Sequence, residues 1–126
     1  MRVTETSQIL LTELEMQQGV VNRAMQRVDE ARSKLLEVQA EQKHSAGELA
    51  RAEDELQHTA DSVREKEISE GIEGLKSSAA ALKIREQERT ESLQSAQDQL
   101  RNAQDTLDGI QDDLNSIVKR LRPTHN

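Results

Sequence analysis

Apolar residues recur every seven positions through the first half of the chain. With Leu14 as heptad position a, one frame runs unbroken from Val3 to Lys66. Its a positions are Ser7, Leu14, Val21, Val28, Leu35, Gln42, Leu49, Leu56 and Val63, and its d positions are Val3, Leu10, Gln17, Ala24, Ala31, Val38, Ser45, Ala52, Thr59 and Lys66. Such a repeat is typical of a left-handed coiled coil, because the apolar seam returns to the same face only against a partner helix. We therefore expect a first helix over about 4–66.

The second half carries the same repeat in a different frame. Its a positions are Ile72, Ala79, Glu86, Leu93, Leu100, Leu107, Leu114 and Leu121, and its d positions are Leu75, Leu82, Arg89, Ala96, Ala103, Ile110 and Ile117. The two frames are offset by two residues at the segment EISEG, 67–71. A continuous coiled coil usually absorbs insertions of about three or four residues, so this offset favours two separate helices.

The segment 67–71 has the composition of a connection between helices. Gly71 can adopt the left-handed conformation that ends a helix, and Ser69 and Glu70 suit a short turn. No capping box marks the restart of the second helix. The sequence thus predicts a single all-α, antiparallel coiled-coil hairpin over residues 1–126. Its expected parts are helix one (4–66), a turn (67–71), helix two (72–122) and a tail (123–126).

The position of the turn fixes which residues face each other. With a five-residue loop at 67–71, a connection of ordinary length for antiparallel helices, Leu35 is expected to face Ala103 and Leu56 to face Leu82. Large side chains then meet small ones, which is how core layers interdigitate. The competing interpretation is one long helix that forms a parallel homodimeric rod and acts as a spacer.

In this register the stretch ILLTELEMQQGVV has no helix beside it. Helix two would end near Leu121, opposite Gln17, and helix one would project about two heptads further. The projecting part is rich in apolar residues on and beside the seam: Ile9, Leu10, Leu11, Leu14, Met16, Val20, Val21 and Met25. A face this wide predicts a bundle of three or more helices, so we expect it to dock a partner helix or a second copy. The alternative is a frayed terminus.

Three polar residues interrupt the seam: Gln42, Glu86 and Arg89. Buried polar side chains penalise shifted pairings, so their expected role is to set the register. Glu86 and Arg89 are three residues apart and can pair along their own helix. A central Gln or Arg within long heptads is similar to membrane-fusion SNARE motifs, although no anchor or lipidation signal accompanies it and heptads alone identify no family. This similarity supplies an alternative function, a membrane-tethering or fusion-type protein that zips with partner helices.

Composition restricts the fold and the function further. Apolar residues make up 33% of the chain and charged residues another 33%, with no Phe, Trp or Tyr. A thick globular core is therefore excluded, because aromatic side chains are its bulkiest fillers. The net charge of -7 disfavours nucleic acid as a partner, since phosphate contacts need clustered cations. The basic run KRLR, 119–122, is explained by the dipole at a helix end.

No residues form a recognisable catalytic or metal-binding set. The chain has no Cys, and His44 and His58 are about 21 Å apart along a helix, which is too far for a shared metal. Asp54 and Asp61 flank His58, but we interpret them as a solvated, salt-linked face. A two-helix structure also offers no enclosed pocket for a small-molecule substrate or a cofactor. We therefore expect neither enzyme activity nor a cofactor.

The expected location is the cytoplasm. The N-terminal segment lacks the features of a signal peptide, and no apolar run reaches membrane-spanning length, so direct membrane insertion is not expected. The function that fits best is a structural or adaptor coiled-coil protein that mediates assembly through helix packing. Its partner would be another helical protein or a second copy of itself, bound at the apolar N-terminal end.

Overall fold

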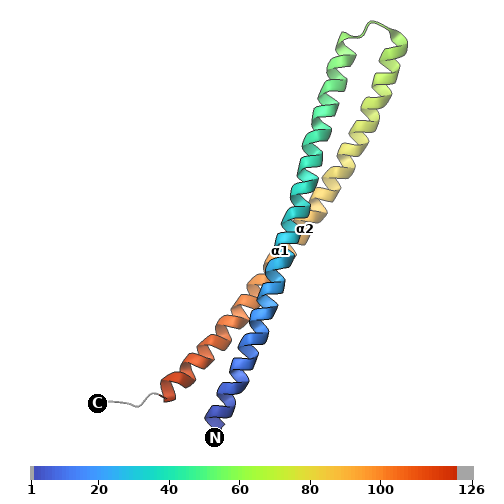
Figure 1. Cartoon of the computed structure of the whole chain (residues 1–126). Helices are drawn as coiled ribbons and strands as arrows, with labels where there is room; N and C mark the ends of the chain where they lie inside the picture. The colour runs from blue at the N-terminus through green and yellow to red at the C-terminus, as the bar shows by residue number, and fades with distance from the viewer. Residues whose placement is uncertain (1, 122–126) are drawn as a thin grey trace. The chain divides into compact units, whose positions relative to one another are not determined.

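The computed structural model describes residues 2–121, with side chains from 4 to 120. Two long helices, α1 (Arg2–His58) and α2 (Ser62–Leu121), pack against each other as a helical hairpin (Figure 1). This confirms the all-α antiparallel hairpin and argues against one continuous rod. The expected tail (123–126) and Arg122, the expected last residue of helix two, lie outside the described residues.

The turn lies at Thr59–Asp61, eight residues before the predicted position. The predicted turn at 67–71 is wrong, because Ser69, Glu70 and Gly71 all lie inside α2. The predicted end of the first helix at residue 66 and start of the second at residue 72 are wrong for the same reason. The glycines do not end a helix here. Among the described residues no φ angle is positive, so the hairpin needs no left-handed glycine.

Asp61 begins α2 as its N-cap. Its Oδ1 accepts a hydrogen bond from the backbone N–H of Val63 at 3.0 Å, and its carbonyl oxygen accepts one from the N–H of Glu65 at 2.9 Å. The first amides of a helix have no partner within the helix, and an aspartate at the N-cap satisfies one of them. A side chain, rather than a special backbone conformation, thus determines where the second helix begins.

Hydrogen bonds and ion pairs also connect the two sides of the turn. The hydroxyl of Thr59 donates to the carbonyl oxygen of Glu55 at 2.7 Å. Arg64 Nη2 lies 2.6 Å from Glu55 Oε1, and its Nη1 lies 3.3 Å from Glu67 Oε2. The pKa of Arg64 is raised above its usual value, mainly by the hydrogen bond to Glu55. These groups are exposed, so they fix local geometry more than they stabilise the fold.

Internal contacts divide the hairpin into two units. The end unit comprises Met1–Glu30 with Gln94–Asn126, and the turn unit comprises Ala31–Leu93. The buried residues of the end unit are Val21, Ala24, Val28, Ala96 and Ala103, and those of the turn unit are Val38, Ser45, Ile68 and Ile72. All of them occupy positions a or d when the second frame is extended back by one heptad, to Ile68. Burial therefore follows both sequence frames within each unit.

The frames differ from the expectation only near the turn. Val63 and Lys66 were expected in the seam of the first helix, but they lie in the first turns of α2, and Val63 is 66% exposed. Ile68 is buried instead, at 7% exposure. The change of frame therefore occurs at the real turn, where the chain passes from one helix to the other.

The pairing register also differs from the predicted one. In the end unit, Gln17 Nε2 donates to the carbonyl oxygen of Ala103 at 2.9 Å, so Ala103 lies beside Gln17. The predicted neighbour of Ala103 was Leu35, which is about 27 Å further along an α-helix. Because both frames repeat every seven residues, a shift of two heptads still places a opposite d. Heptad pattern and side-chain size therefore permit either register, and the position of the turn selects one.

Candidate docking surface

The N-terminal part of α1 is paired with α2 throughout the described end unit. Leu10 and Thr6 line a hollow together with Asp113 and Ile117 of α2, and Val21 is only 8% exposed. The predicted unpaired overhang is therefore wrong. The error followed from the misplaced turn, which shifted the pairing of the two helices by two heptads and left the start of helix one without a neighbour.

The eight residues predicted to dock a partner separate into two groups. Leu10 and Leu14 are half-buried and Val21 is buried, all on the seam that faces α2. The other five are exposed although they are large and apolar: Ile9, Leu11, Met16, Val20 and Met25. Val118 of α2, at 46% exposure, adds a sixth exposed apolar residue to the same unit. Of the residues predicted to dock a partner, this exposed group presents the most apolar surface to solvent.

These exposed residues lie on two opposite faces of the end unit. In an antiparallel helix pair, positions e and b of both helices share one face, and positions g and c share the other. The observed ion pair between Arg85 Nη1 and Glu41 Oε2, at 3.4 Å, joins two g positions and agrees with this geometry. Leu11, Met25 and Val118 occupy e positions, which places them on what we call the e/b face.

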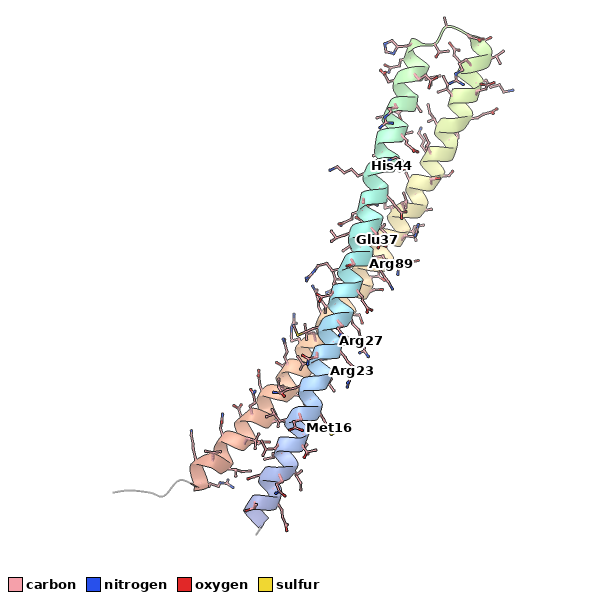
Figure 2. All side chains as sticks on the ribbon, viewed as in Figure 1. Met16, Arg23, Arg27, Glu37, His44 and Arg89 are labelled. Atoms are coloured by element: carbon pink, nitrogen blue, oxygen red, sulfur yellow. The ribbon has the colours of Figure 1, made fainter. Side chains whose placement is uncertain are left out.

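The opposite face of the end unit, here called the g/c face, carries Ile9, Met16 and Val20. Met16 is the most exposed large apolar residue of the described side chains, at 67%, and it is labelled on α1 in Figure 2. The c positions of α2 on this face are occupied by Ser95, Asn102, Gly109 and Ser116, and all four are exposed. Apolar side chains thus project from α1, while the c positions of α2 carry small or uncharged residues. The g positions of α2 on this face carry Gln99, Thr106, Asp113 and Arg120.

The polar seam residues lie in the turn unit. Gln42, Glu86 and Arg89 are all half-buried, and Figure 2 labels Arg89 on α2. Glu86 Oε2 accepts a hydrogen bond from Gln39 Nε2 of α1 at 3.5 Å. This contact crosses between the helices, whereas the sequence suggested a pair with Arg89 along the same helix. A cross-helix bond depends on the register, so it suits the predicted role of Glu86, which stays a prediction.

Sequence reasoning missed Gln17 as a residue that joins the helices. Its position d within an apolar stretch was visible in the frame, and a polar residue there signals a specific partner across the seam. The buried Ser45 was also missed. Its hydroxyl is enclosed and has no hydrogen-bond partner among the described residues. Ser45 lines an open groove in the turn unit whose other lining residues are Ala40, Glu41, His44, Glu48, Leu75, Ser78 and Leu82.

The histidines make local contacts on α1. His44 Nε2 lies 2.8 Å from Glu48 Oε1, four residues away on the same helix. His58 Nδ1 lies 2.8 Å from the carbonyl oxygen of Asp54 and 3.5 Å from its Oδ1. Within the described part of the chain, no three or more His, Asp or Glu side chains are grouped so that they could hold a metal ion.

Neither α1 nor α2, over the residues described, contains a stretch both long and apolar enough to cross a bilayer. No protein-family model, curated protein or solved structure matches the chain.

Proposed function

We propose that this chain is a non-enzymatic structural or adaptor coiled-coil protein that mediates protein–protein assembly through helix packing. The observation that carries the proposal is the number of exposed large apolar residues on the two faces of the end unit. Ile9, Met16 and Leu11 are each at least half exposed, in a chain with little apolar surface to spare. Apolar patches of this kind mark interaction surfaces more often than incidental exposure.

The internal seam does not account for these residues. The seam of the end unit is already filled by its own a and d residues, of which Ala24 and Val28 are 3% and 6% exposed. That packing leaves much of the apolar surface of the side chains outside the seam uncovered, since Leu11 and Met25 stay 50% and 48% exposed. Each would contribute roughly 1.5–3 kcal/mol if a partner covered it fully, and about half of that from its present exposure.

The g/c face of the end unit suits a helix from another protein. Ile9 and Met16 are seven residues apart and Val20 follows four residues later, so all three lie along one side of α1. The small c residues of α2, such as Gly109 and Ser116, let a third helix approach closely beside them. An amphipathic partner helix laid between the two helices would cover the apolar side chains with its own apolar face.

Site-specific photo-cross-linking in the cells that produce the protein tests this proposal. A photoreactive amino acid at Met16 is expected to give an adduct with a discrete second protein, because Met16 would be covered by the partner helix. The matched control is Ile84, which is 59% exposed but lies on α2 in the turn unit. Equal adduct patterns from Met16 and Ile84, or none from Met16 and Val20, would contradict docking on the g/c face.

A further inference from the structure

The e/b face of the end unit has the symmetry of a self-association surface. We propose that it binds a second copy of the chain, antiparallel to the first, about a two-fold axis that passes by Gln18 and Gln104. This inference rests on the proposed assembly function and deepens it by naming the partner for one of the two faces. The g/c face would stay available to a different protein.

The e positions of the end unit carry no charged residue on either helix. They are Thr4, Leu11, Gln18 and Met25 on α1, and Gln97, Gln104, Gln111 and Val118 on α2, and all eight are exposed. In coiled coils these positions usually carry Glu and Lys. The e positions of the turn unit include four charged residues, Arg32, Glu53, Lys76 and Lys83, beside the uncharged Gln39, Ala46 and Thr90. An uncharged, exposed stripe on a chain that is one-third charged is typical of an interface core, where charged residues are depleted.

Gln18 and Gln104 lie at the same level of the hairpin. Gln17 donates its side-chain hydrogen bond to the carbonyl oxygen of Ala103, and Gln18 and Gln104 directly follow these two residues in the chain. One axis perpendicular to the helices can therefore pass by both. A two-fold at this point places α1 against α1 of the second copy, and α2 against α2, each pair antiparallel.

Apolar residues meet across this axis. Leu11 and Met25 lie seven residues on either side of Gln18, so Leu11 faces the partner's Met25 and Met25 faces the partner's Leu11. Both are about half exposed in the single chain, at 50% and 48%. Gln18 faces the second copy's Gln18, and Gln104 faces the second copy's Gln104. Amide side chains can donate and accept reciprocally in such pairs.

The charges that border the stripe are complementary about the same axis. Arg101 and Asp108 are b residues three positions before and four positions after Gln104, so Arg101 of each copy faces the partner's Asp108. On α1, Glu15 faces the partner's Asn22, and Asp29 faces the partner's Gln8. No like charges meet at these positions.

The other two-fold arrangement fits worse. An axis parallel to the helices would place α1 against α2 of the second copy at the same level. Leu11 and Met25 would then each face a glutamine, and Glu15 would face the partner's Asp108. Two carboxylates in that position repel each other, and neither apolar residue gains an apolar neighbour. The sequence of the stripe therefore selects the antiparallel dimer.

The stripe is also long enough for a stable complex. Residues 7–29 of α1, the part of the end unit that is symmetric about Gln18, span about 33 Å, and two adjacent helices are roughly 20 Å wide. An interface of this outline covers on the order of 650 Å² on each copy, within the range of about 600–1,000 Å² per partner for standard specific interfaces. The glutamines supply hydrogen bonds around a small apolar centre, like the polar rim around the apolar core of a typical protein–protein interface.

Sedimentation equilibrium and thiol cross-linking of the full chain test the dimer. The expected mass is twice 14.2 kDa, and it should return to 14.2 kDa in the variant Leu11→Glu with Met25→Glu. The single variants Gln18→Cys and Gln104→Cys should each form covalent dimers with a short bismaleimide linker. The parallel-axis dimer predicts the reverse, since an adduct would then form only when Gln18→Cys and Gln104→Cys chains are mixed.

A charge-reversal series checks the register of the dimer. Arg101→Asp alone should weaken association, measured as an increase in the dissociation constant of at least about tenfold, because two aspartates then face each other. Arg101→Asp together with Asp108→Arg should restore it. Arg23→Glu, on the g/c face, is the matched control and should leave the mass unchanged, and the helical circular dichroism of every variant shows that it folds.

Each outcome has a separate meaning for the two proposals. A monomeric mass at the highest usable concentration overturns the self-association, whether or not Met16 forms adducts with another protein. Failure of the Arg101 and Asp108 double variant to recover also overturns it. Adducts at Met16 in a monomeric chain would leave the proposed assembly function standing without the dimer. A dimer without Met16 adducts would restrict assembly to self-association.

Discussion

Gln17 and Ala103 lie side by side although 86 positions separate them in the chain, joined by a 2.9 Å hydrogen bond from a side-chain amide to a backbone carbonyl. Gln17 occupies a d position of α1, where most residues are apolar. Its side-chain amide donates to a backbone carbonyl of the facing helix, a hydrogen bond that an apolar side chain at this position could not make. This hydrogen bond shows which residues of α1 and α2 lie beside each other in the end unit, and this register can be tested directly.

Paired cysteines should report this register. The observed register puts Val21 opposite Ala103, and the two are 8% and 7% exposed, so Val21→Cys with Ala103→Cys should form a disulfide within one chain. The α-carbons must approach within about 7 Å for this bond. Leu35→Cys with Ala103→Cys is the control and should stay reduced, because Leu35 lies two heptads, about 21 Å, from Val21 along α1. Gel mobility with and without reductant measures both, and the opposite pattern would restore the predicted register.

Asp61 should be the most sensitive residue of the turn. Asp61→Ala removes the acceptor of the Val63 N–H and is expected to lower the free energy of unfolding by about 1 kcal/mol, the usual cost of losing an N-cap. Asp61→Asn keeps an oxygen in the same place and should cost little. Chemical denaturation followed by circular dichroism measures both, and equal losses would mean that the carboxylate does not act as a cap.

Gly71 and Gly74 should tolerate alanine and gain stability from it. Both lie within α2 without a positive φ, and a Cβ added at either position would meet nothing within 4 Å. Each substitution is expected to raise the free energy of unfolding by about 0.5–1 kcal/mol. A turn at 67–71 would give the opposite result at Gly71, because alanine disfavours the left-handed conformation. Thermal unfolding of the two single variants separates these cases.

The hydroxyl of Ser45 should cost stability. It is buried without a hydrogen-bond partner in the described structure, and an unsatisfied buried polar group costs about 1–3 kcal/mol. Ser45→Ala is therefore expected to stabilise the chain by more than Ser77→Ala, an exposed position within α2 where only the helix propensity changes. If the two variants are equally stabilised, the Ser45 hydroxyl has a partner in solution, and bound water is the simplest one.

The heptad repeat correctly predicted the seam, because a seam is defined by many residues together and not by any single one. Residues as far apart as Val21, Val38 and Ala96 are all buried as their frames require. A seam built from about fifteen heptad layers tolerates an occasional polar residue, so Gln42 or Arg89 does not obscure it.

The position of the turn could not be predicted in this way, because it depends on a few residues that each could mark a helix boundary. Gly71 looked like a helix end, whereas Asp61 looked like one more charged surface residue. The free energy that separates these alternatives is small, about 1 kcal/mol for a cap and a similar amount for a glycine in a helix. The location of the docking surface depended on the turn, so the sequence predicted that the seam residues Leu10 and Leu14 would lie in an unpaired overhang, whereas both are half-buried against α2.

The three-residue turn at 59–61 also implies an order of folding. The ion pair between Glu55 and Arg64 closes a loop of only nine residues, whereas the Gln17 contact closes one of 86. Short loops lose less chain entropy on closing, so the helices should zip from the turn outward. The end unit would then form last and open first. A partner that binds the end unit would therefore stabilise the helix pair where the two helices separate most easily.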